Sequence, residues 1–369
     1  MNSALQVLPP EPLEATRAST QDMPNRFGHV FVSSDVTERQ WDDYVERHPD
    51  ATVDHLWRWR QVFEHVFRQR PVYLVARRHG VLAGVLPLVL FRSRIFGRFA
   101  VSVPFLNYGG VLADDPEVAR LLVADARKTA ANFGAAHLEL RHQRRAFHEL
   151  PCRQHKVGFS RRLPATAAAL WSEIDRKIRN QVRKATKEDL RAAVGGVDLV
   201  DDFYAVFAQN MRDLGTPVYA KQLFLETLRL FPHRARVFTV RRGDRTLAAA
   251  ITMTFRGTVL VPWASSLRDA RHLCPNTLLY WTMLEHATNS GAQVFDFGRS
   301  SSGGGVNQFK LQWGATAAPL HWEYVLLRRA HVPNHGPSNP KFQTAIRAWQ
   351  WLPIWLANGL GPHIVRSIP

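Results

Sequence analysis

The chain has 369 residues, of which 46% are hydrophobic and 21% are charged. This composition is typical of a globular protein and excludes a mainly disordered or fibrous one. The formal net charge of +17 favours anionic partners such as nucleic acid, phosphorylated lipids or sugar nucleotides, although a generally high arginine content would give the same value.

Cysteine content and hydropathy exclude further classes of protein. Cys152 and Cys274 are the only cysteines, so a disulfide scaffold and a cysteine-rich zinc module are excluded. No metal-ligand spacing such as H-E-x-x-H occurs, and no metal is expected. The N-terminus has no apolar signal segment, and no apolar run is long enough for a spanning helix. A cytoplasmic protein is expected.

The first part of the chain alternates strand and helix signals. Residues 1–25 mix proline, serine and glutamate without periodicity, so they are expected to form a disordered tail. An edge strand is predicted to begin near Phe27. Residues 73–91 contain two apolar runs separated by Arg-Arg-His-Gly, which is typical of a β-hairpin. A helix over residues 116–133 and a strand over residues 137–141 follow.

The most basic part of the chain lies between residues 141 and 191. Within it, Ser172 and Asp175 have capping-box spacing at the start of a predicted helix. This helix is amphipathic, and Arg179 and Arg183 lie on its nearly all-positive face. Because like charges four residues apart repel, such a face favours contact with an anionic ligand over a merely solvated surface.

The second part repeats the order of the first. Residues 237–255 again have the pattern of a hairpin, and residues 259–266 that of a strand. Asn276, after a proline, is expected to cap a helix over residues 277–290, and residues 292–298 form the next predicted strand. Hairpin, strand, helix and strand therefore occur twice, which favours an internal duplication of a mixed α/β unit.

A glycine-rich loop follows, in the stretch FDFGRSSSGGGVNQFKLQWG of residues 295–314. A P-loop needs a lysine directly after its last glycine, but valine follows Gly305. A serine nucleophile elbow needs G-x-S-x-G, which is also absent here. The remaining interpretation is a loop joined to a short helix that carries Lys310. At this point two interpretations of Lys310 remain open: an exposed helix lysine and a lysine that binds a ligand.

The same stretch, continued to FKLQWGATAAPLHWEY, resembles the signature of the FemAB-type transferases. It is most similar to the branch associated with exosortase (PEP-CTERM) polysaccharide systems. The basic segment KIRNQVRKA and the C-terminal NPKFQTAIRAWQWLPIWLANGLGPHIVRSIP are also similar to that branch. The resemblance runs from about residue 27 to the end of the chain. Trp322 departs from it, because a tyrosine is usual there.

The resemblance implies an α+β fold of two tandem GNAT-like acyltransferase domains. The tail covers residues 1–25, and the two domains are expected over residues 26–160 and 161–330. Residues 331–369 are expected to pack on the first domain or to lie on a membrane surface through their tryptophans.

The resemblance also implies transfer of an acyl or aminoacyl group to an amine. The acceptor would be an envelope polysaccharide, a lipid-linked sugar or a peptidoglycan-type precursor, which makes the substrate anionic. The donor would be aminoacyl-tRNA or acyl-CoA, used as a co-substrate with no tightly bound cofactor. Possible partners are therefore tRNA and the inner membrane. An acyl-CoA-dependent N-acetyltransferase and a non-catalytic adaptor for RNA or membrane are the alternatives.

The resemblance points to particular site residues. Lys310 would stabilise the negative charge of the tetrahedral intermediate. Asp296 would orient or deprotonate the amine, unless it is a structural cap, and Arg299 would hold a phosphate or carboxylate. Tyr108 either contacts the acceptor or packs in the core. The other expected substrate contacts are Ser300, Gly303, Gly304, Phe309, Asn276, Arg179 and Arg183.

Overall fold

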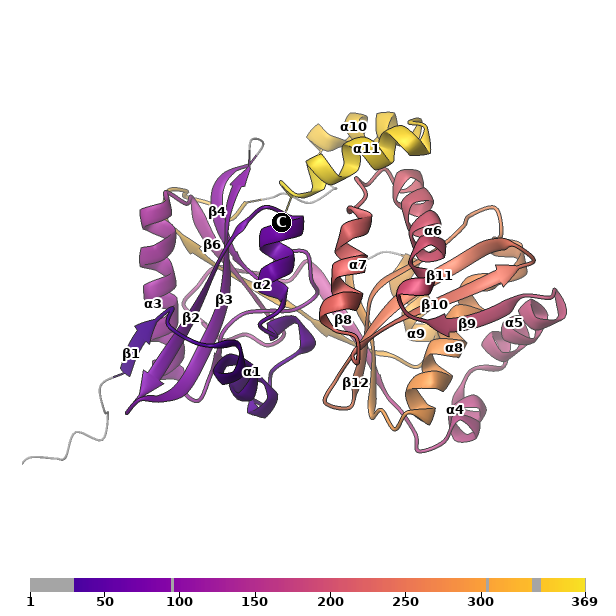
Figure 1. The fold of residues 1–369 in the computed structure, drawn as a ribbon, viewed down its shortest axis with the longest axis horizontal. Helices are drawn as coiled ribbons and strands as arrows, with labels where there is room; N and C mark the ends of the chain where they lie inside the picture. The colour runs from indigo at the N-terminus through magenta and orange to yellow at the C-terminus, as the bar shows by residue number, and fades with distance from the viewer. Residues whose placement is uncertain (1–29, 94–95, 303–304, 334–339, 369) are drawn as a thin grey trace, which may run out of the picture.

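Two β-sheets lie side by side in the computed structural model, which describes residues 30–93, 96–302, 305–333 and 340–368 (Figure 1). The predicted tail over residues 1–25 lies outside these ranges. The first sheet has the strand order β1-β2-β3-β4-β6-β15-β7, and β5 pairs with β3. Its strands are β1 (Val30–Ser33), β2 (Arg70–Arg78), β3 (Val81–Ser93), β4 (Gly97–Ser102), β5 (Leu112–Ala113), β6 (His137–His142), β7 (Cys152–Arg153) and β15 (His321–Leu326).

The second sheet has the order β14-β8-β13-β12-β11-β10-β9. Its strands are β8 (Lys156–Arg162), β9 (Arg191–Gly195), β10 (Ala235–Arg242), β11 (Arg245–Phe255), β12 (Thr258–Ser266), β13 (Val294–Ser301) and β14 (Thr316–Pro319).

The repeated order predicted from the sequence is confirmed. The hairpins β2-β3 and β10-β11 are antiparallel, whereas β4 pairs with β6, and β12 with β13, in parallel. A helix makes each parallel crossover: α3 (Pro116–Phe133) in the first half and α8 (Pro275–Asn289) in the second. The mixed α/β fold with two GNAT-like halves thus follows from two copies of one strand–helix–strand plan.

Helices cover both sheets. On the first sheet, α3 packs on the outer face, while α1 and α2 lie between that sheet and the second half (Figure 1). In the second half, α8 packs on the sheet with α4 and α5 beside it, and α6 also packs against β10 and β11. The remaining helices are α1 (Glu38–Arg47), α2 (Trp59–Gln61), α4 (Ala167–Glu173), α5 (Arg176–Lys187), α6 (Val200–Asp213), α7 (Lys221–Leu230), α9 (Gly305–Gln312), α10 (Pro340–Gln350) and α11 (Ile354–Val365). Short helical turns occupy Val53–His55, Val62–Val66, Val197–Leu199 and Arg271–Leu273.

One hydrophobic core runs through both halves. At the junction, the ring centres of Trp59 and Phe231 lie 5.0 Å apart, and those of Phe105 and Tyr219 lie 6.3 Å apart. A shared core of large aromatic side chains disfavours independent movement of the halves, because separating them would expose this apolar surface to water.

The limits of the halves differ from the sequence prediction in two places. The predicted boundary at residue 160 falls inside β8, and all of β8 pairs within the second sheet. The predicted second domain extends to residue 330, yet β15 returns to the first sheet and pairs with β6. The chain therefore crosses between the sheets twice, before β8 and after β14.

Two predicted helix starts are also different in the structure. Ser172 does not cap the basic helix; it lies inside α4, and Asp175 is the N-cap of α5 because its side chain accepts the Lys177 amide. Asn276 lies within the first turn of α8, after Cys274 at the N-cap, rather than capping the helix.

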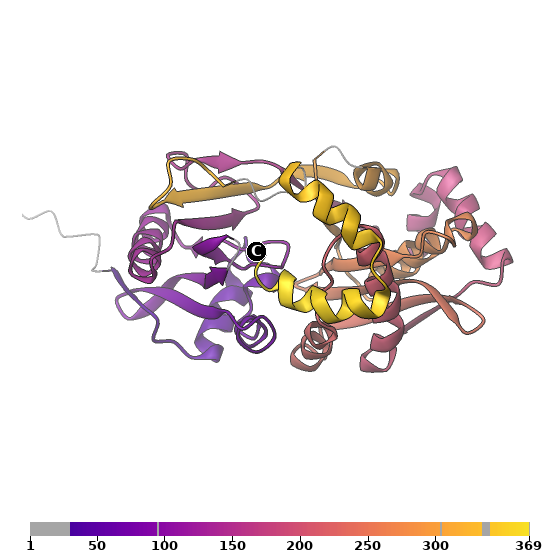
Figure 2. The same cartoon turned by 90° about the horizontal axis from the view of Figure 1, so that it is seen from above.

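The C-terminal helices α10 and α11 lie across the top of the second half (Figures 1 and 2). They pack mainly on α6, not on the first domain as one interpretation of the sequence had it. Arg212 of α6 donates to the Leu352 carbonyl at 3.2 Å, and near the C-terminus Gln69 of the first half donates to the Arg366 carbonyl. None of the helices in the described ranges combines the length and the apolar character that crossing a bilayer requires.

Candidate active site

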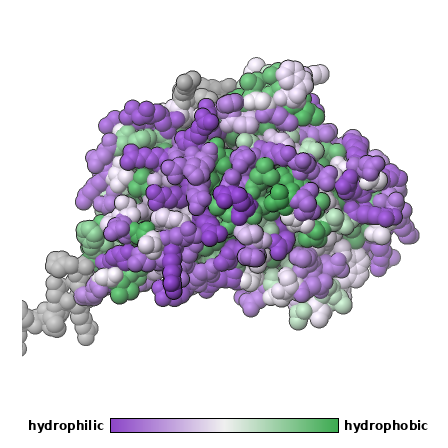
Figure 3. All heavy atoms as spheres, in the orientation of Figure 1, coloured by the Kyte–Doolittle hydropathy of each residue, from purple (hydrophilic) through white to green (hydrophobic). Residues whose placement is uncertain are grey.

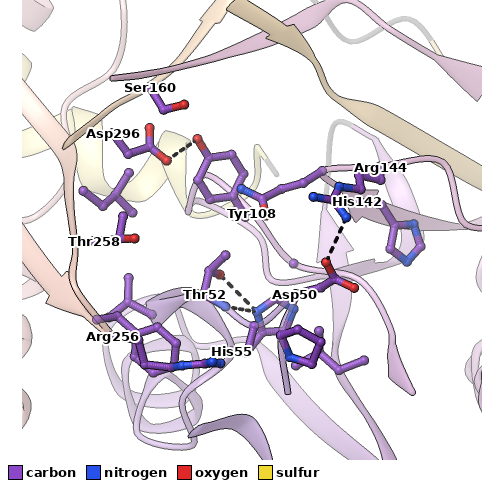
Figure 4. A pocket seen from close by; sticks show the side chains of 18 of the residues that line it. Asp50, Thr52, His55, Tyr108, His142, Arg144, Ser160, Arg256, Thr258 and Asp296 are labelled. Carbon is purple, nitrogen blue, oxygen red and sulfur yellow. Dashed lines mark hydrogen bonds and ion pairs between the residues drawn. The ribbon is translucent and has the colours of Figure 1, made fainter. Parts of the chain in front are cut away.

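A cavity of about 610 Å³ lies between the two halves (Figure 4). The first half contributes the loop around Thr52 and His55, the segment that begins at Tyr108, and residues that follow β6. The second half contributes β8, β13 and the turn between β11 and β12. Both halves line this inter-half pocket, and junctions between two units are a preferred position for ligand sites in proteins.

The two halves are joined at the wall of the pocket by Tyr108 and Asp296. The Tyr108 hydroxyl donates to Asp296 Oδ2 at 2.7 Å, and Asp296 Oδ1 accepts the Gly298 amide at 2.8 Å (Figure 4). Burial raises the pKa of Asp296 to about 6, although these hydrogen bonds and the charge of Lys310 oppose the rise. Burial likewise raises the pKa of Tyr108 well above its usual value. A carboxylate that titrates near neutrality suits a general base.

Asp54 holds the segment that carries Tyr108. Its Oδ2 accepts the backbone amides of Asn107 and Tyr108 at 3.1 and 2.8 Å. Burial raises the pKa of this carboxyl to about 7, with the negative charge of Asp296 adding to the rise. Beside it, burial lowers the pKa of His55 to about 3, so its imidazole is neutral at physiological pH.

β12 and β13 separate next to Asp296. The parallel pairing ends where Leu260 faces Asp296, and Gly298 then adopts a φ of 69°. A Cβ atom at Gly298 would lie 2.7 Å from the carbonyl oxygen of Val261, so this left-handed bulge requires glycine. The bulge interrupts the ladder with β8, and within the described residues β12 and β13 are not paired beyond Asp296.

Lys310 of α9 reaches into this bulge. Its Nζ donates to the carbonyls of Gly298 at 2.8 Å and Arg299 at 3.3 Å. The residue is 4% exposed, so the interpretation of Lys310 as an exposed helix lysine is wrong. Burial lowers its pKa to about 8, against the opposing charge of Asp296. The ammonium has three N–H donors, of which two are used by these carbonyls, and the side chain is not part of the pocket wall.

Arg299 and Ser300 follow the bulge on β13. Burial, followed by the charge of Arg141, lowers the pKa of Arg299 to about 10. Its guanidinium carbon lies 5.2 Å from the centre of the Trp322 ring. Within the described residues, the buried Ser300 hydroxyl and Arg299 Nη1 have no hydrogen-bond partner.

The other expected contact residues are not part of the inter-half pocket. Phe309 packs against Tyr280 and Trp313 in the core. The guanidinium of Arg183 lies 5.7 Å from the Trp171 ring centre, and Arg179 approaches the Trp171 carbonyl. Gly303 and Gly304 lie outside the described residues.

A second polar surface is formed where α5 meets the first turn of α8. The Thr277 hydroxyl donates to the side-chain oxygen of Gln181, which ties the two helices together. No side chain caps α8. Pro275 has no N–H and the Thr277 amide already donates to the Cys274 carbonyl, so within the described residues the Asn276 amide is the one that this turn offers to a ligand. Arg176 and Lys184 of α5 line a shallow depression together with Gln181. A helix N-terminus beside a basic helix face can bind the phosphate groups of a donor.

Several residues of the site were not found from the sequence. Asp54 and Arg141 carry no motif spacing that would mark them. His142 Nδ1 and Glu323 Oε2 lie 2.6 Å apart, and Glu323 also accepts the Phe147 amide, which fixes the loop on one side of the pocket. The Glu-Tyr pair of the resembling segment could have drawn attention to Glu323, but only the fold reveals its partner.

The arrangement combines a buried carboxylate, a buried ammonium and a β-bulge at the end of a parallel strand pairing beside a pocket. These parts fit nucleophilic attack of an amine on an activated carbonyl, because the carboxylate can accept a proton and the ammonium can stabilise an oxyanion.

Comparisons with known proteins agree with this fold. Residues 172–311 match the acetyltransferase (GNAT) domain family. The crystal structure of FemX is similar with a TM-score of 0.63 and 14% identity, covering 86% of this chain and 100% of FemX. The L-PGS structure from Bacillus licheniformis has a TM-score of 0.54 and 10% identity, covering 86% and 98%.

A further similar structure is the C-terminal domain of a protein described as a lysylphosphatidylglycerol synthetase from Agrobacterium fabrum. Its TM-score is 0.54 and its identity 12%, covering 79% of this chain and 92% of that domain. The sequence matches no curated protein. At these identities the structural likeness concerns the fold alone, whereas the GNAT match supports an acyltransferase that takes its acyl group from a co-substrate.

Proposed function

We propose that this chain, which carries a GNAT-type acyltransferase domain over residues 172–311, transfers an acyl or aminoacyl group to an amine held in the inter-half pocket. The observation that carries the proposal is the 2.7 Å hydrogen bond from Tyr108 to Asp296, which places a titratable carboxylate from one half against a tyrosine from the other at the pocket wall.

In the proposed reaction, the acceptor amine binds in the pocket and Asp296 accepts its proton. The amine nitrogen forms a bond to the acyl carbon, and the bond between that carbon and the leaving sulfur or oxygen breaks. The leaving group then takes up a proton, so charges balance. The remaining N–H donor of Lys310 would stabilise the oxyanion, while its other two hold the bulge at Gly298.

The donor is proposed to approach between the unpaired C-terminal parts of β12 and β13, with its phosphates at the first turn of α8. The GNAT match favours acyl-CoA. The exposed basic face of α5 favours a larger polyanion, and on that ground aminoacyl-tRNA is the second candidate donor. Calorimetric titration with CoA and with charged tRNA separates the two candidates. The true donor should bind to the wild type, and its affinity should be lower in the variant Lys184→Glu.

The proposed acceptor is an amino group of an envelope polysaccharide, a lipid-linked sugar or a peptidoglycan-type precursor. Its support is the FemAB-like segment from residue 295 onwards and the FemX-like fold. The exosortase-associated branch is part of this proposal. Mass spectrometry of envelope precursors from cells with and without the gene tests it; identical precursor masses would remove the proposed acceptor class.

We also propose that the protein associates peripherally with an anionic membrane surface. Trp351 and Trp355, at the junction of α10 and α11, are 87% and 72% exposed. Hydrophobic residues lie along the top edge of the molecule, where Figure 1 places α10 and α11 (Figure 3). Indole rings favour the interface of a bilayer, and Arg347 lies one helical turn before Trp351. This position would bring the pocket near lipid-linked acceptors.

A non-catalytic adaptor is the rival proposal. An adaptor would need the basic surface but not the buried Asp296 and Lys310. Burial of these charged groups lowers the stability of the fold, and a non-catalytic protein would not use them. It predicts strongly salt-dependent binding and no covalent product with any donor.

A further inference from the structure

Two arginines share one indole ring where the sheets meet. Arg141 comes from β6, Arg299 from β13 and Trp322 from β15. The guanidinium carbon of Arg141 lies 4.1 Å from the centre of the Trp322 ring, and that of Arg299 lies 5.2 Å from it. Both distances are within the range of cation–π contacts, which help to hold the two cations in place.

The buried donors of this cluster lack acceptors. Glu139 Oε1 accepts Nε of Arg141 at 2.7 Å. Both terminal nitrogens of Arg141, Nη1 of Arg299 and the indole nitrogen of Trp322 are buried and have no partner in the part of the chain that the structure describes. Buried polar groups are nearly always hydrogen-bonded, because an unpaired one loses its contact with water without replacement.

The positive charge of the cluster is not balanced either. Glu139 is the partner of Arg141 and also interacts with Tyr324. Asp54, whose charge acts on Arg299, uses Oδ2 for two backbone amides. Of the two guanidinium groups, that of Arg141 is directly bonded to a carboxylate, whereas that of Arg299 forms no ion pair within the described residues. Burial of an excess charge is costly unless an anion accompanies it.

We propose that Arg141, Trp322 and Arg299 form a binding site for an oxyanion, a carboxylate or a phosphate group of the acceptor or donor. Arg299 is partly exposed and one residue from the bulge at Gly298, so it meets the anion first. Arg141 is 1% exposed and supplies the second positive charge. The planar guanidinium fork suits both anion shapes.

This site deepens the proposed function, since its residue Arg299 lies on β13, the strand that carries Asp296, and would orient an anionic substrate beside that carboxylate. Its test, however, measures binding without any acyl donor. Failure of transfer and failure of anion binding are therefore separate results.

The experiment is thermal unfolding and calorimetric titration of the full chain at low ionic strength with inorganic pyrophosphate, inorganic phosphate or succinate. We expect at least one anion to raise the melting temperature of the wild type. In Arg299→Gln we expect affinity for that anion to fall roughly 10- to 100-fold, as for loss of a charge-assisted hydrogen bond. The variant itself should fold, because it removes one of two like charges that lie close together.

Matched variants locate the anion. Arg162→Gln removes an exposed arginine of β8, and Arg92→Gln removes an exposed arginine of β3; both should keep the wild-type response to the anion. A response to succinate but not to either phosphate assigns a carboxylate, and the reverse assigns a phosphate. No response of the wild type to any of the three, an unchanged response in Arg299→Gln, or an equal loss in Arg162→Gln or Arg92→Gln would overturn the proposal.

Discussion

The hydroxyl of Tyr108 donates a hydrogen bond to Oδ2 of Asp296 across 188 positions of sequence and from one half of the molecule to the other. This contact couples the geometry of the halves to the ionisation of a buried carboxylate, because a donated hydrogen bond favours the charged form.

Replacing Tyr108 by phenylalanine should slow transfer by about 10- to 100-fold, a typical range for loss of a group that positions a general base. Because the hydrogen bond from Tyr108 lowers the pKa of Asp296, its loss should raise that pKa further. Steady-state kinetics over a pH series checks both effects. A slower enzyme with an unmoved acidic limb would mean that Tyr108 acts only through packing.

Lys310→Met keeps most of the side-chain volume but removes the ammonium. Transfer should fall by at least about 100-fold, as on loss of an oxyanion donor. The exposed Lys128→Met on α3 is the matched control and should retain full activity. Circular dichroism verifies that both variants fold. Unchanged turnover in Lys310→Met would remove this lysine from the mechanism.

The rate of transfer should depend on pH with two limbs. Asp296 must be deprotonated to accept a proton, so the rate should rise as pH passes its pKa of about 6. Lys310 must be protonated to stabilise an oxyanion, so the rate should fall as pH passes about 8. The pKa of Asp54, about 7, lies between those of Asp296 and Lys310. Profiles of kcat/KM against pH for the wild type and Asp54→Asn therefore test whether the acidic limb belongs to Asp296. Loss of the acidic limb in Asp54→Asn would assign that limb to Asp54.

Gly298→Ala should destabilise the protein and reduce transfer, since its new methyl group would lie 2.7 Å from the Val261 carbonyl oxygen in a left-handed backbone. Gly80→Ala is a matched control, with a φ of 79° and no neighbouring atom within 4 Å. The control should lose about 1 kcal/mol of unfolding free energy, and Gly298→Ala clearly more. Urea unfolding measures both losses. Equal losses would show that the strand separation tolerates a side chain.

The double variant Trp351→Ser with Trp355→Ser should reduce binding to vesicles that contain anionic phospholipid, because it removes the two most exposed indoles from the surface. Val81→Ser, which changes a 67% exposed residue at the start of β3, should bind like the wild type. Vesicle flotation measures the bound fraction. Equal binding by the double variant would assign membrane contact to another surface or to none.

Local patterns predicted much of the fold. The two hairpins, the helices α3 and α8 and the strands after them follow from short-range signals of alternation, capping and turn residues. The break between α4 and α5 was missed, because the apolar period continues through Ile174 while the backbone there is extended. The return of β15 to the first sheet depends on pairing with β6, which lies far away in the sequence.

The candidate site was only partly predictable for the same reason. Lys310, Asp296 and Arg299 lie in one motif-bearing segment and could be selected from the sequence. The partners that give them chemical character are Tyr108, Asp54 and Arg141, which reach them only through the folded arrangement of the halves. Burial, not spacing, shifts the pKa values that make the cluster suitable for proton transfer.

The passage of β15 into the first sheet has a consequence for synthesis on the ribosome. A nascent chain that has emerged only as far as β8 lacks β15, which pairs with β6 in the finished protein. The edge of the first sheet at β6 therefore stays unpaired until residue 326 has left the exit tunnel. The N-terminal half is consequently not expected to be a self-sufficient fragment. A split of the gene between β7 and β8 would yield two pieces that must associate to become stable.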